Sequence, residues 1–427
     1  MVNFLHVSDT HLGCTSSDVR HMTIKYLNMN FQPIEFDFAR AYWKIITYAL
    51  EKKDEIDFIV HSGDFYHYPF LRHPYPPSEA SRNIAVKGLK RLDRAGIPTI
   101  IIDGNHGIFH SRRTSTIQSF EVLENVKVFT FWDDLINVLQ GNKKQLIYNL
   151  NEKDCVIHCF PFVNKKYLGS LSEDAKDEYL NWLKTYNTSN KGVTEIGVTH
   201  GMKLDETLPA ELLDIDFDYL AVGHNHHFEK ISKKAYNAGA IERWRFDESD
   251  QEKVILEVQA EHDELPNVTS ITLDSRPMLS TIIDANTDDP PSAVIEKVQK
   301  YLNTHKLATG FDFDSAFRVK IGVKGDMPHT FWARFNAELT ELYNEIMRKD
   351  DYNILQFSIG RISDPIAEDL ELKPGEEVEY LIENPEKDFR KFIEKISPED
   401  YDIDLLIRLF SDAVKRVEEA SNTPPKR

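Results

Sequence analysis

The sequence of 427 residues has few cysteines and no long apolar run. Cys14, Cys155 and Cys159 match neither a zinc ribbon nor a disulfide framework. No stretch approaches the ~20 apolar residues that a membrane span needs, and the N-terminus lacks a basic n-region and a signal cleavage site. We therefore expect an intracellular protein, in the cytoplasm or nucleoid, without a membrane-spanning segment.

Basic residues are also scarce, because 51 lysines and arginines face 70 aspartates and glutamates and leave a net charge of −19. This balance argues against a protein that coats nucleic acid with a broad basic face. A polyanionic substrate would have to be held locally. Bound divalent cations could hold it, since they are often the largest local charges in a site.

A chain of this length is too long for one compact core and predicts two or three domains. Residues 1 to about 260 alternate strand-like apolar runs with helix-like segments, which predicts an α/β layered domain. Helical spacing of apolar residues predicts a covering helix that contains Phe38, Ala41, Tyr42, Ile45, Ile46 and Ala49. In open α/β sheets, ligands bind beyond the carboxyl ends of the strands, so we expect the functional residues there.

The motif SRPM, which begins at Ser275, marks a change of pattern. Residues 275–363 predict a small α+β domain, with a helix opened by Pro290 and Pro291 and a long helix after Pro328. Residues 364–427 carry 18 acidic and 10 basic side chains and predict two amphipathic helices. Their apolar stripes are suited to docking a partner or to packing on the rest of the chain.

Polar residues that suit metal binding follow five of the predicted strands. They are Asp9 and His11, Asp64, Asn105 and His106, His200, and finally His224 and His226. Each residue alone is more often an ordinary turn residue, but five such motifs in order favour a common site. Mixed Asp, Asn and His ligands suit manganese, iron or zinc, and the absence of Cys ligands argues against structural zinc.

Two metals ~3.5 to 4 Å apart would activate a water and neutralise charge on a phosphodiester, but they repel one another and need a shared anionic ligand. Asp64 is the candidate for that bridge. One metal would take Asp9 and His11 and the other Asn105 and His200, with His224 and His226 divided between them. We expect an extended chain from Asp9 to His11, so that both side chains point to the same side.

The order D-x-H, G-D, G-N-H, an isolated His and G-H-x-H resembles the calcineurin-like metallophosphoesterases. The segments SDTHLG and NAGAIERWRF and the SRPM junction are similar to the SbcD, or Mre-eleven, branch of DNA double-strand-break repair nucleases. The resemblance implies a metallophosphoesterase layered β-sandwich flanked by helices over residues 1–274. It also implies a DNA-capping α+β domain over 275–363 and a linker with a helix pair over 364–427.

The resemblance implies a manganese-dependent two-metal phosphodiesterase that acts as a double-strand exonuclease and a single-strand or hairpin endonuclease. Its expected partners are DNA, a coiled-coil ATPase of the SbcC or Rad-fifty type and a second copy of the chain. Seven residues align with metal ligands: Asp9, His11, Asp64, Asn105, His200, His224 and His226. His67 and His106 match the catalytic histidines that are not ligands, and His106 would protonate the leaving oxygen.

Two departures from the family pattern affect the expected site. Gly107 follows His106 where the family usually has an acidic residue, which removes a carboxylate that could orient a ligand. Ala238 and Ala240 flank Gly239 where Pro and Ser are common. These differences concern the positioning of site residues and leave the expected fold unchanged.

Four arginines are weaker candidates for contacts with DNA phosphates: Arg112, Arg113, Arg243 and Arg245. Solvation is the usual role of paired arginines on loops, and Trp244 between the last two is a candidate for packing. Cys155 and Cys159 lie in a buried-looking strand, where free cysteine behaves as a small hydrophobe.

Two other functions fit the same residues. A small phosphodiester or a phosphoprotein could replace DNA as the substrate, although the predicted capping domain and the ERWRF segment argue against it. A non-catalytic scaffold of the same fold is the other alternative, motivated by Gly107 and the acidic composition. Every candidate ligand position nevertheless keeps a side chain that can bind metal.

Overall fold

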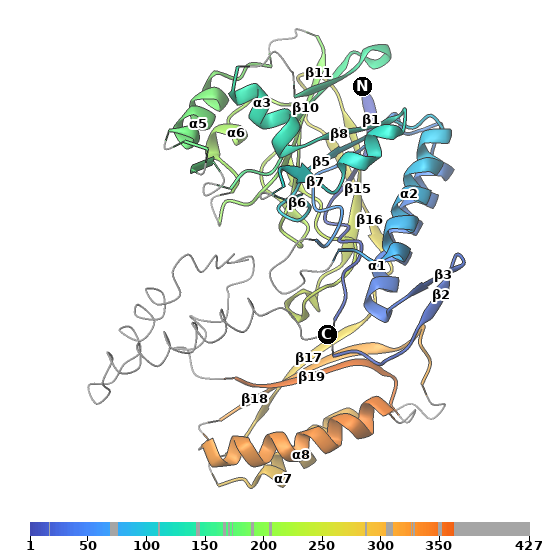
Figure 1. The fold of residues 1–427 in the computed structure, drawn as a ribbon, viewed down its shortest axis with the longest axis vertical. Coiled ribbons are helices and arrows are strands. Elements are labelled where there is room, and N and C mark those ends of the chain that lie inside the picture. Colours follow the sequence, from blue (N-terminus) through green and yellow to red (C-terminus); the bar gives the residue numbers. More distant parts are fainter. Residues whose placement is uncertain are drawn as a thin grey trace, which may run out of the picture. The chain divides into compact units, whose positions relative to one another are not determined.

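The computed structural model describes residues 1–362, apart from residues 17, 69–75, 110–111, 142–145, 165–167, 170, 173, 189–191, 205–206, 287, 305–310, 326, 328 and 349–351. The first 273 residues form two six-stranded sheets flanked by helices (Figure 1). This is the layered α/β architecture that the sequence predicts. The two predicted helices of residues 364–427 lie outside the described residues.

The first sheet has a parallel centre and an antiparallel edge. Its strands, in spatial order, are β16 (Asn267–Leu273), β15 (Lys253–Ala260), β1 (Val2–Val7), β4 (Phe58–His61), β5 (Thr99–Ile102) and β8 (Val126–Phe129). The four strands from β1 to β8 run parallel, so their carboxyl ends lie at one edge of the sheet. β15 pairs antiparallel with both β1 and β16.

The second sheet follows the same plan. Its spatial order is β13 (Glu229–Lys230), β14 (Ala235–Asn237), β12 (Tyr219–Gly223), β11 (Thr194–His200), β10 (Cys155–Phe160) and β9 (Ile147–Leu150). β10, β11, β12 and β14 run parallel, with an antiparallel strand at each edge. Two short hairpins complete this part of the chain: β2 (Ile24–Tyr26) with β3 (Met29–Phe31), and β6 (Ile108–Phe109) with β7 (Thr114–Ser115).

Helices cover the outer faces of the sheets. In Figure 1, α1 (Pro33–Glu51) and α2 (Glu79–Arg94) lie on one side, and α3 (Ile136–Leu139), α5 (Ala175–Thr185) and α6 (Ala210–Leu213) lie on the other. Pro33 and the acidic Glu35 open α1, and the Ser78 hydroxyl caps α2 by accepting a hydrogen bond from the Ser81 amide. All six apolar residues that predicted α1 are buried.

Successive side chains of β1 point to opposite faces of the first sheet and belong to two different cores. Phe4 packs between the two sheets, stacked on Phe58 of β4, while Leu5 and Val7 belong to the core beneath α1 and α2. The inter-sheet core also contains Cys155 and Cys159, which are buried free thiols as expected for small hydrophobes.

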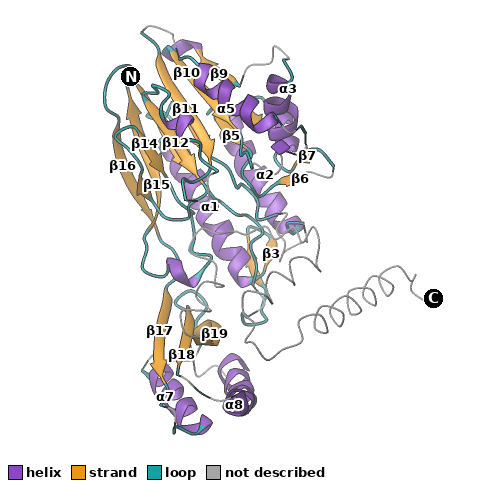
Figure 2. Cartoon of the chain, turned by 90° about the vertical axis from the view of Figure 1, so that its left-hand side faces the viewer, coloured by secondary structure: helices purple, strands orange, loops and turns teal. Residues whose placement is uncertain are grey.

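Residues 275–362 build a separate α+β module. The parallel strands β17 (Met278–Asp284), β18 (Phe317–Lys324) and β19 (Ile354–Ile362) share a core with α7 (Pro291–Asn303) and α8 (His329–Arg348), which lie beside them in Figure 2. Both helices fall where the sequence predicts them. Contacts divide the chain into Met1–Glu376 and Glu377–Arg427, and the finer division at residue 275 stays a prediction.

Buried arginines join the α+β module to the rest of the same unit. Arg276, of the SRPM motif, forms two hydrogen bonds with the Asp37 carboxylate of α1, at 2.6 and 2.8 Å. Arg318 of β18 donates to the backbone oxygens of Arg243 and Trp244, at 2.7 and 2.8 Å. Paired charges and satisfied donors make the burial of these guanidinium groups tolerable.

None of the described helices combines the length and the apolar composition required to cross a membrane.

Two buried histidines make the fold sensitive to acid. The ring of His6 contacts the Tyr219 and Ser62 hydroxyls, each at 2.9 Å, and that of His61 contacts the Thr10 hydroxyl at 3.1 Å. Burial is the main reason that the pKa of each falls from 6.5 to about 3. The unfolded chain binds these protons below pH 6.5 while the folded chain does not, so stability is lost as pH falls from 6.5 toward 3.

We expect each histidine to lower the free energy of unfolding by about 1.4 kcal/mol per pH unit in that window. Urea unfolding in EDTA at several pH values between 7.5 and 5 measures this slope. H6Q and H61Q should each reduce this slope by about 1.4 kcal/mol per pH unit, which corresponds to one proton. H21Q, at an exposed position, should leave the slope unchanged. Parallel curves for the wild type and both buried-site variants would contradict the prediction.

Candidate metal centre

The carboxyl ends of the parallel strands bring the predicted ligands together. Asp9 and His11 follow β1, Asp64 follows β4, and Asn105 follows β5. From the second sheet, His200 ends β11, and His224 and His226 follow β12. Both sheets therefore contribute to one cluster of side chains.

The backbone from Asp9 to His11 is not extended as expected. β1 ends at Val7, and Asp9 and His11 have φ values of +48° and +38°. Asp64 and His224 are likewise left-handed, at +53° and +98°. The prediction of an extended segment is wrong because these loops turn tightly to aim their side chains. Such backbone is costly for residues other than glycine and gathers at functional sites.

Three residues form a first possible metal-binding group, namely Asp9, His11 and His226, whose ligand atoms lie within 4.8 Å of one another. The Nε2 atoms of His11 and His226 are 3.0 Å apart, and His11 Nε2 is 3.7 Å from Asp9 Oδ1. Asp9 Oδ1 is buried without a hydrogen-bond partner among the described residues. A divalent cation would satisfy that oxygen, so these donors fit a metal ion.

A second group consists of Asp64, His200 and His224, with Asn105 beside them. Asn105 Oδ1 lies 2.9 Å from His200 Nε2 and 2.8 Å from His224 Nδ1. Oδ2 of Asp64 is 3.4 Å from His200 Nε2 and 3.7 Å from His11 Nε2. Asp64 thus lies between the two groups. His226 belongs to the first group and His224 to the second.

Hydrogen bonds fix which ring nitrogen faces the centre. His200 Nδ1 donates to the Ser62 carbonyl oxygen at 2.7 Å, which leaves the Nε2 lone pair for a metal. Burial lowers the pKa of His200, but the neighbouring Asp64 carboxylate more than offsets this effect and raises it to about 9. Burial is also the main reason that the pKa of His11 is well below its usual value. Metal binding at such a centre must displace protons.

His67 and His106 lie beside the first group. Both are buried, their rings stack at 5.1 Å, and His67 Nδ1 is 3.1 Å from His11 Nδ1. The His106 backbone amide donates to Asp64 Oδ1 at 2.8 Å. The Trp244 ring packs edge-on against His67, with centroids 4.5 Å apart, so packing accounts for its position.

Sequence reasoning missed two buried residues next to His226. Glu248, at the end of a short 3₁₀ turn, has its Oε1 atom 3.1 Å from His226 Nδ1. Lys253, at the start of β15, contacts Glu248 and donates to the His226 backbone oxygen at 2.9 Å. Burial would raise the pKa of Glu248, but Lys253 and His226 hold it below its usual range. No spacing in the polar run around Glu248 could have signalled this contact.

The four candidate arginines have contacts within the protein. Arg243 donates to the backbone oxygens of Gln251 and Arg276, while Arg245 lies over the Trp244 ring at 4.6 Å. Arg112 and Arg113 lie over the rings of Phe109 and Trp132, at 6.0 and 5.3 Å. Their contacts with DNA stay a prediction.

The backbone and the surroundings of Gly107 favour glycine at this departure from the family pattern. Gly107 has φ +106°, and a Cβ atom there would lie 2.7 Å from the Thr116 hydroxyl oxygen. Ala238 and Ala240 are both buried, and the amide of Ala240 donates to the His226 backbone oxygen at 3.1 Å. The left-handed backbone and the nearby Thr116 hydroxyl therefore disfavour an acidic side chain at position 107.

Restoring a side chain at position 107 should therefore destabilise the protein. Positive φ costs a non-glycine residue roughly 1–2 kcal/mol, and the contact with Thr116 adds to that cost for G107A. Gly96 is a matched control, since its φ is +73° and a Cβ there meets nothing within 4 Å. Urea unfolding should show a larger loss for G107A than for G96A, and equal losses would contradict the steric argument.

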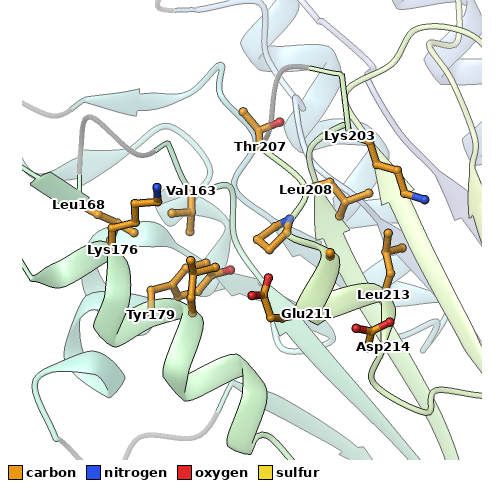
Figure 3. A pocket seen from close by; sticks show the side chains of 13 residues that line it. Val163, Leu168, Lys176, Tyr179, Lys203, Thr207, Leu208, Glu211, Leu213 and Asp214 are labelled. Atoms are coloured by element: carbon orange, nitrogen blue, oxygen red, sulfur yellow. The ribbon is translucent and has the colours of Figure 1, made fainter.

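A largely apolar pocket of about 580 Å³ is lined by residues of α5 and α6 and of neighbouring loops. Figure 3 shows its lining side chains, among them Leu168, Tyr179 and Leu208. Lys176 and Lys203 also line it. None of the seven candidate ligands does, so this pocket is not part of the metal centre.

Comparison with known proteins agrees with this geometry. The family model described as calcineurin-like phosphoesterase matches residues 2–228. A protein named DNA double-strand break repair protein Mre11 from Sulfurisphaera tokodaii is 27% identical over 224 residues, which are 52% of this chain and 48% of that protein. The protein of that name from Methanococcus maripaludis is 25% identical over 234 residues, 53% and 52% of the two chains.

The Sulfolobus acidocaldarius protein of the same name is 22% identical over 308 residues, 70% of each chain. The chain spans about half the length of the first two relatives. The match to the family model covers more than half of the chain and contains all seven candidate ligands. The chain belongs to the calcineurin-like phosphoesterase family, a family of metal-dependent hydrolases.

Proposed function

We propose that this chain is a two-metal DNA nuclease that processes double-strand breaks, as an exonuclease on duplex ends and an endonuclease on hairpins or single strands. The observation that carries the proposal is the position of Asp64 Oδ2, 3.4 Å from His200 Nε2 and 3.7 Å from His11 Nε2. One carboxylate oxygen lies between two groups of metal-binding side chains. The similarity to proteins named for DNA double-strand break repair supports DNA as the substrate.

The residues divide into two sets of ligands. Asp9, His11 and His226 would hold one manganese ion, and Asn105, His200 and His224 the other, with Asp64 shared. The ions, when bound, would supply Lewis-acid activation of a water and neutralise charge on the phosphodiester. Asp9 and Asp64 are both buried, which excludes competing solvent from their carboxylate oxygens.

His106 and His67 would serve the reacting phosphate. The imidazole of His106, which lies 3.9 Å from Asp64 Oδ2, would hold a proton and deliver it to the leaving oxygen. The stacked ring of His67 would hold His106 in place, and Trp244 packs behind it. The three rings form one side of the centre.

We also propose the partners that the resemblance implies. Residues 364–427 would bind a coiled-coil ATPase of the SbcC or Rad-fifty type, residues 275–363 would cap the DNA, and two copies of the chain would form a dimer. The protein would act inside the cell, where its substrate is. Deletion of residues 385–427 should abolish co-purification with the ATPase, and unchanged association would exclude this docking role.

The proposed activity is tested by comparing substrates. The full chain, stripped of metal and titrated with manganese, is assayed on linear duplex DNA and on bis(p-nitrophenyl) phosphate. Manganese-dependent cleavage of DNA supports a nuclease. Turnover of the small ester alone would favour a small-phosphodiester enzyme, and binding of fewer than two manganese ions without turnover of either would favour a scaffold.

A further inference from the structure

Among the Nδ1 atoms of His11, His200 and His226, that of His226 is the one that faces a carboxylate in the described part of the chain. His11 Nδ1 faces the His67 ring at 3.1 Å, and His200 Nδ1 faces the Ser62 carbonyl oxygen at 2.7 Å. At the same ring position, His226 Nδ1 lies 3.1 Å from Glu248 Oε1. An anionic partner fixes the tautomer and makes the opposite nitrogen a stronger metal donor.

Lys253 completes the arrangement around His226. Its ammonium group contacts the other carboxylate oxygen of Glu248, and both side chains are only 1% exposed. The same ammonium donates to the His226 backbone oxygen at 2.9 Å. His226 is therefore held at two points, its ring by Glu248 and its main chain by Lys253.

Stability alone does not account for the buried pair of Glu248 and Lys253. A buried ion pair contributes little net stability compared with apolar residues of similar size. Glu248 Oε1 also accepts a hydrogen bond from the Arg245 amide at 3.0 Å, which fixes the carboxylate itself. Gly107 provides no carboxylate beside His106, whereas Glu248 provides one beside His226.

We propose that Glu248 and Lys253 are positioning residues that set the metal affinity of the group formed by Asp9, His11 and His226. Glu248 accepts the hydrogen bond from Nδ1 and so directs the Nε2 lone pair toward the ion, and Lys253 holds the Glu248 carboxylate in place. The inference rests on the proposed two-metal site. It predicts an asymmetry, in which loss of Glu248 weakens one site and leaves the other unchanged.

Two variants separate positioning from folding. E248D keeps a carboxylate for Lys253 but is one methylene too short to reach His226 in the same way. E248Q/K253M removes both charges together, so that no unpaired charge is buried. E252Q is the matched control, since Glu252 is a neighbouring exposed carboxylate.

The test is manganese titration by calorimetry, with electron paramagnetic resonance to distinguish a coupled pair of ions from a single ion. Unfolding in EDTA reports folding independently of metal. In E248D and E248Q/K253M, we expect one site with unchanged affinity and one weakened roughly 10- to 100-fold, with loss of the coupled-pair signal at two equivalents. E252Q should match the wild type.

Two results would overturn the inference in distinguishable ways. Two ions bound with wild-type affinity in both folded variants would show that Glu248 and Lys253 serve structure alone, while the proposed function stands. Fewer than two ions bound by the wild type would overturn the two-metal site itself, and the inference with it.

Discussion

Replacement of Asp64 with alanine is expected to remove both metal ions and DNA cleavage together. Asp64 Oδ2 is the carboxylate oxygen that lies within 4 Å of histidines from both groups. Without it, two cations would face each other with no shared anion to offset their repulsion. The loss of activity should exceed the roughly 10- to 100-fold that outer partners of metal ligands cost.

Manganese titration and a duplex-cleavage assay on D64A measure this effect. The exposed Asp247 provides a control, because D247A removes the same kind of side chain at a position that is not a candidate ligand and should bind two ions and cleave normally. Retention of two tightly bound ions by D64A would show that Asp64 does not bridge.

Replacement of His106 with asparagine should separate metal binding from cleavage. The contact of residue 106 with Asp64 Oδ1 comes from its backbone amide, which every substitution except proline keeps. The ligands should therefore stay in place while the proton donor is lost. General acid catalysis contributes about 10²- to 10⁴-fold, so we expect a fall of that size in cleavage rate.

Single-turnover cleavage with saturating manganese, together with the metal titration, tests this separation. H21N, at an exposed histidine, should behave as the wild type in both measurements. A loss of bound metal in H106N would instead place His106 among the ligands or their supports.

Much of the fold could be predicted because its elements are strongly patterned. The apolar runs before Asp9, Asp64 and His200 predicted the central strands, and Pro290 and Pro291 predicted the start of α7. The pairing of β15 beside β1 could not be predicted, because the two strands lie some 250 residues apart and nothing local specifies a neighbour.

Most of the site could be predicted for the same reason. Ligands that directly end strands have a sequence signal, and parallel strands carry them to one edge. Contacts made across the fold have none: Glu248 reaches His226 from a polar run, and Arg276 reaches Asp37 across 239 positions. The left-handed backbone at Asp9 and His11 also went unforeseen, because φ is set by the turn and not by these residue types.

The way Arg318 attaches β18 to the segment around Trp244 has an evolutionary consequence. Its guanidinium binds two main-chain oxygens, which are present whatever amino acids stand at positions 243 and 244. Mutation can thus rewrite that stretch without severing the link, whereas a change at Arg318 severs both bonds at once. These two bonds therefore depend on the residue at position 318 and not on the side chains at positions 243 and 244.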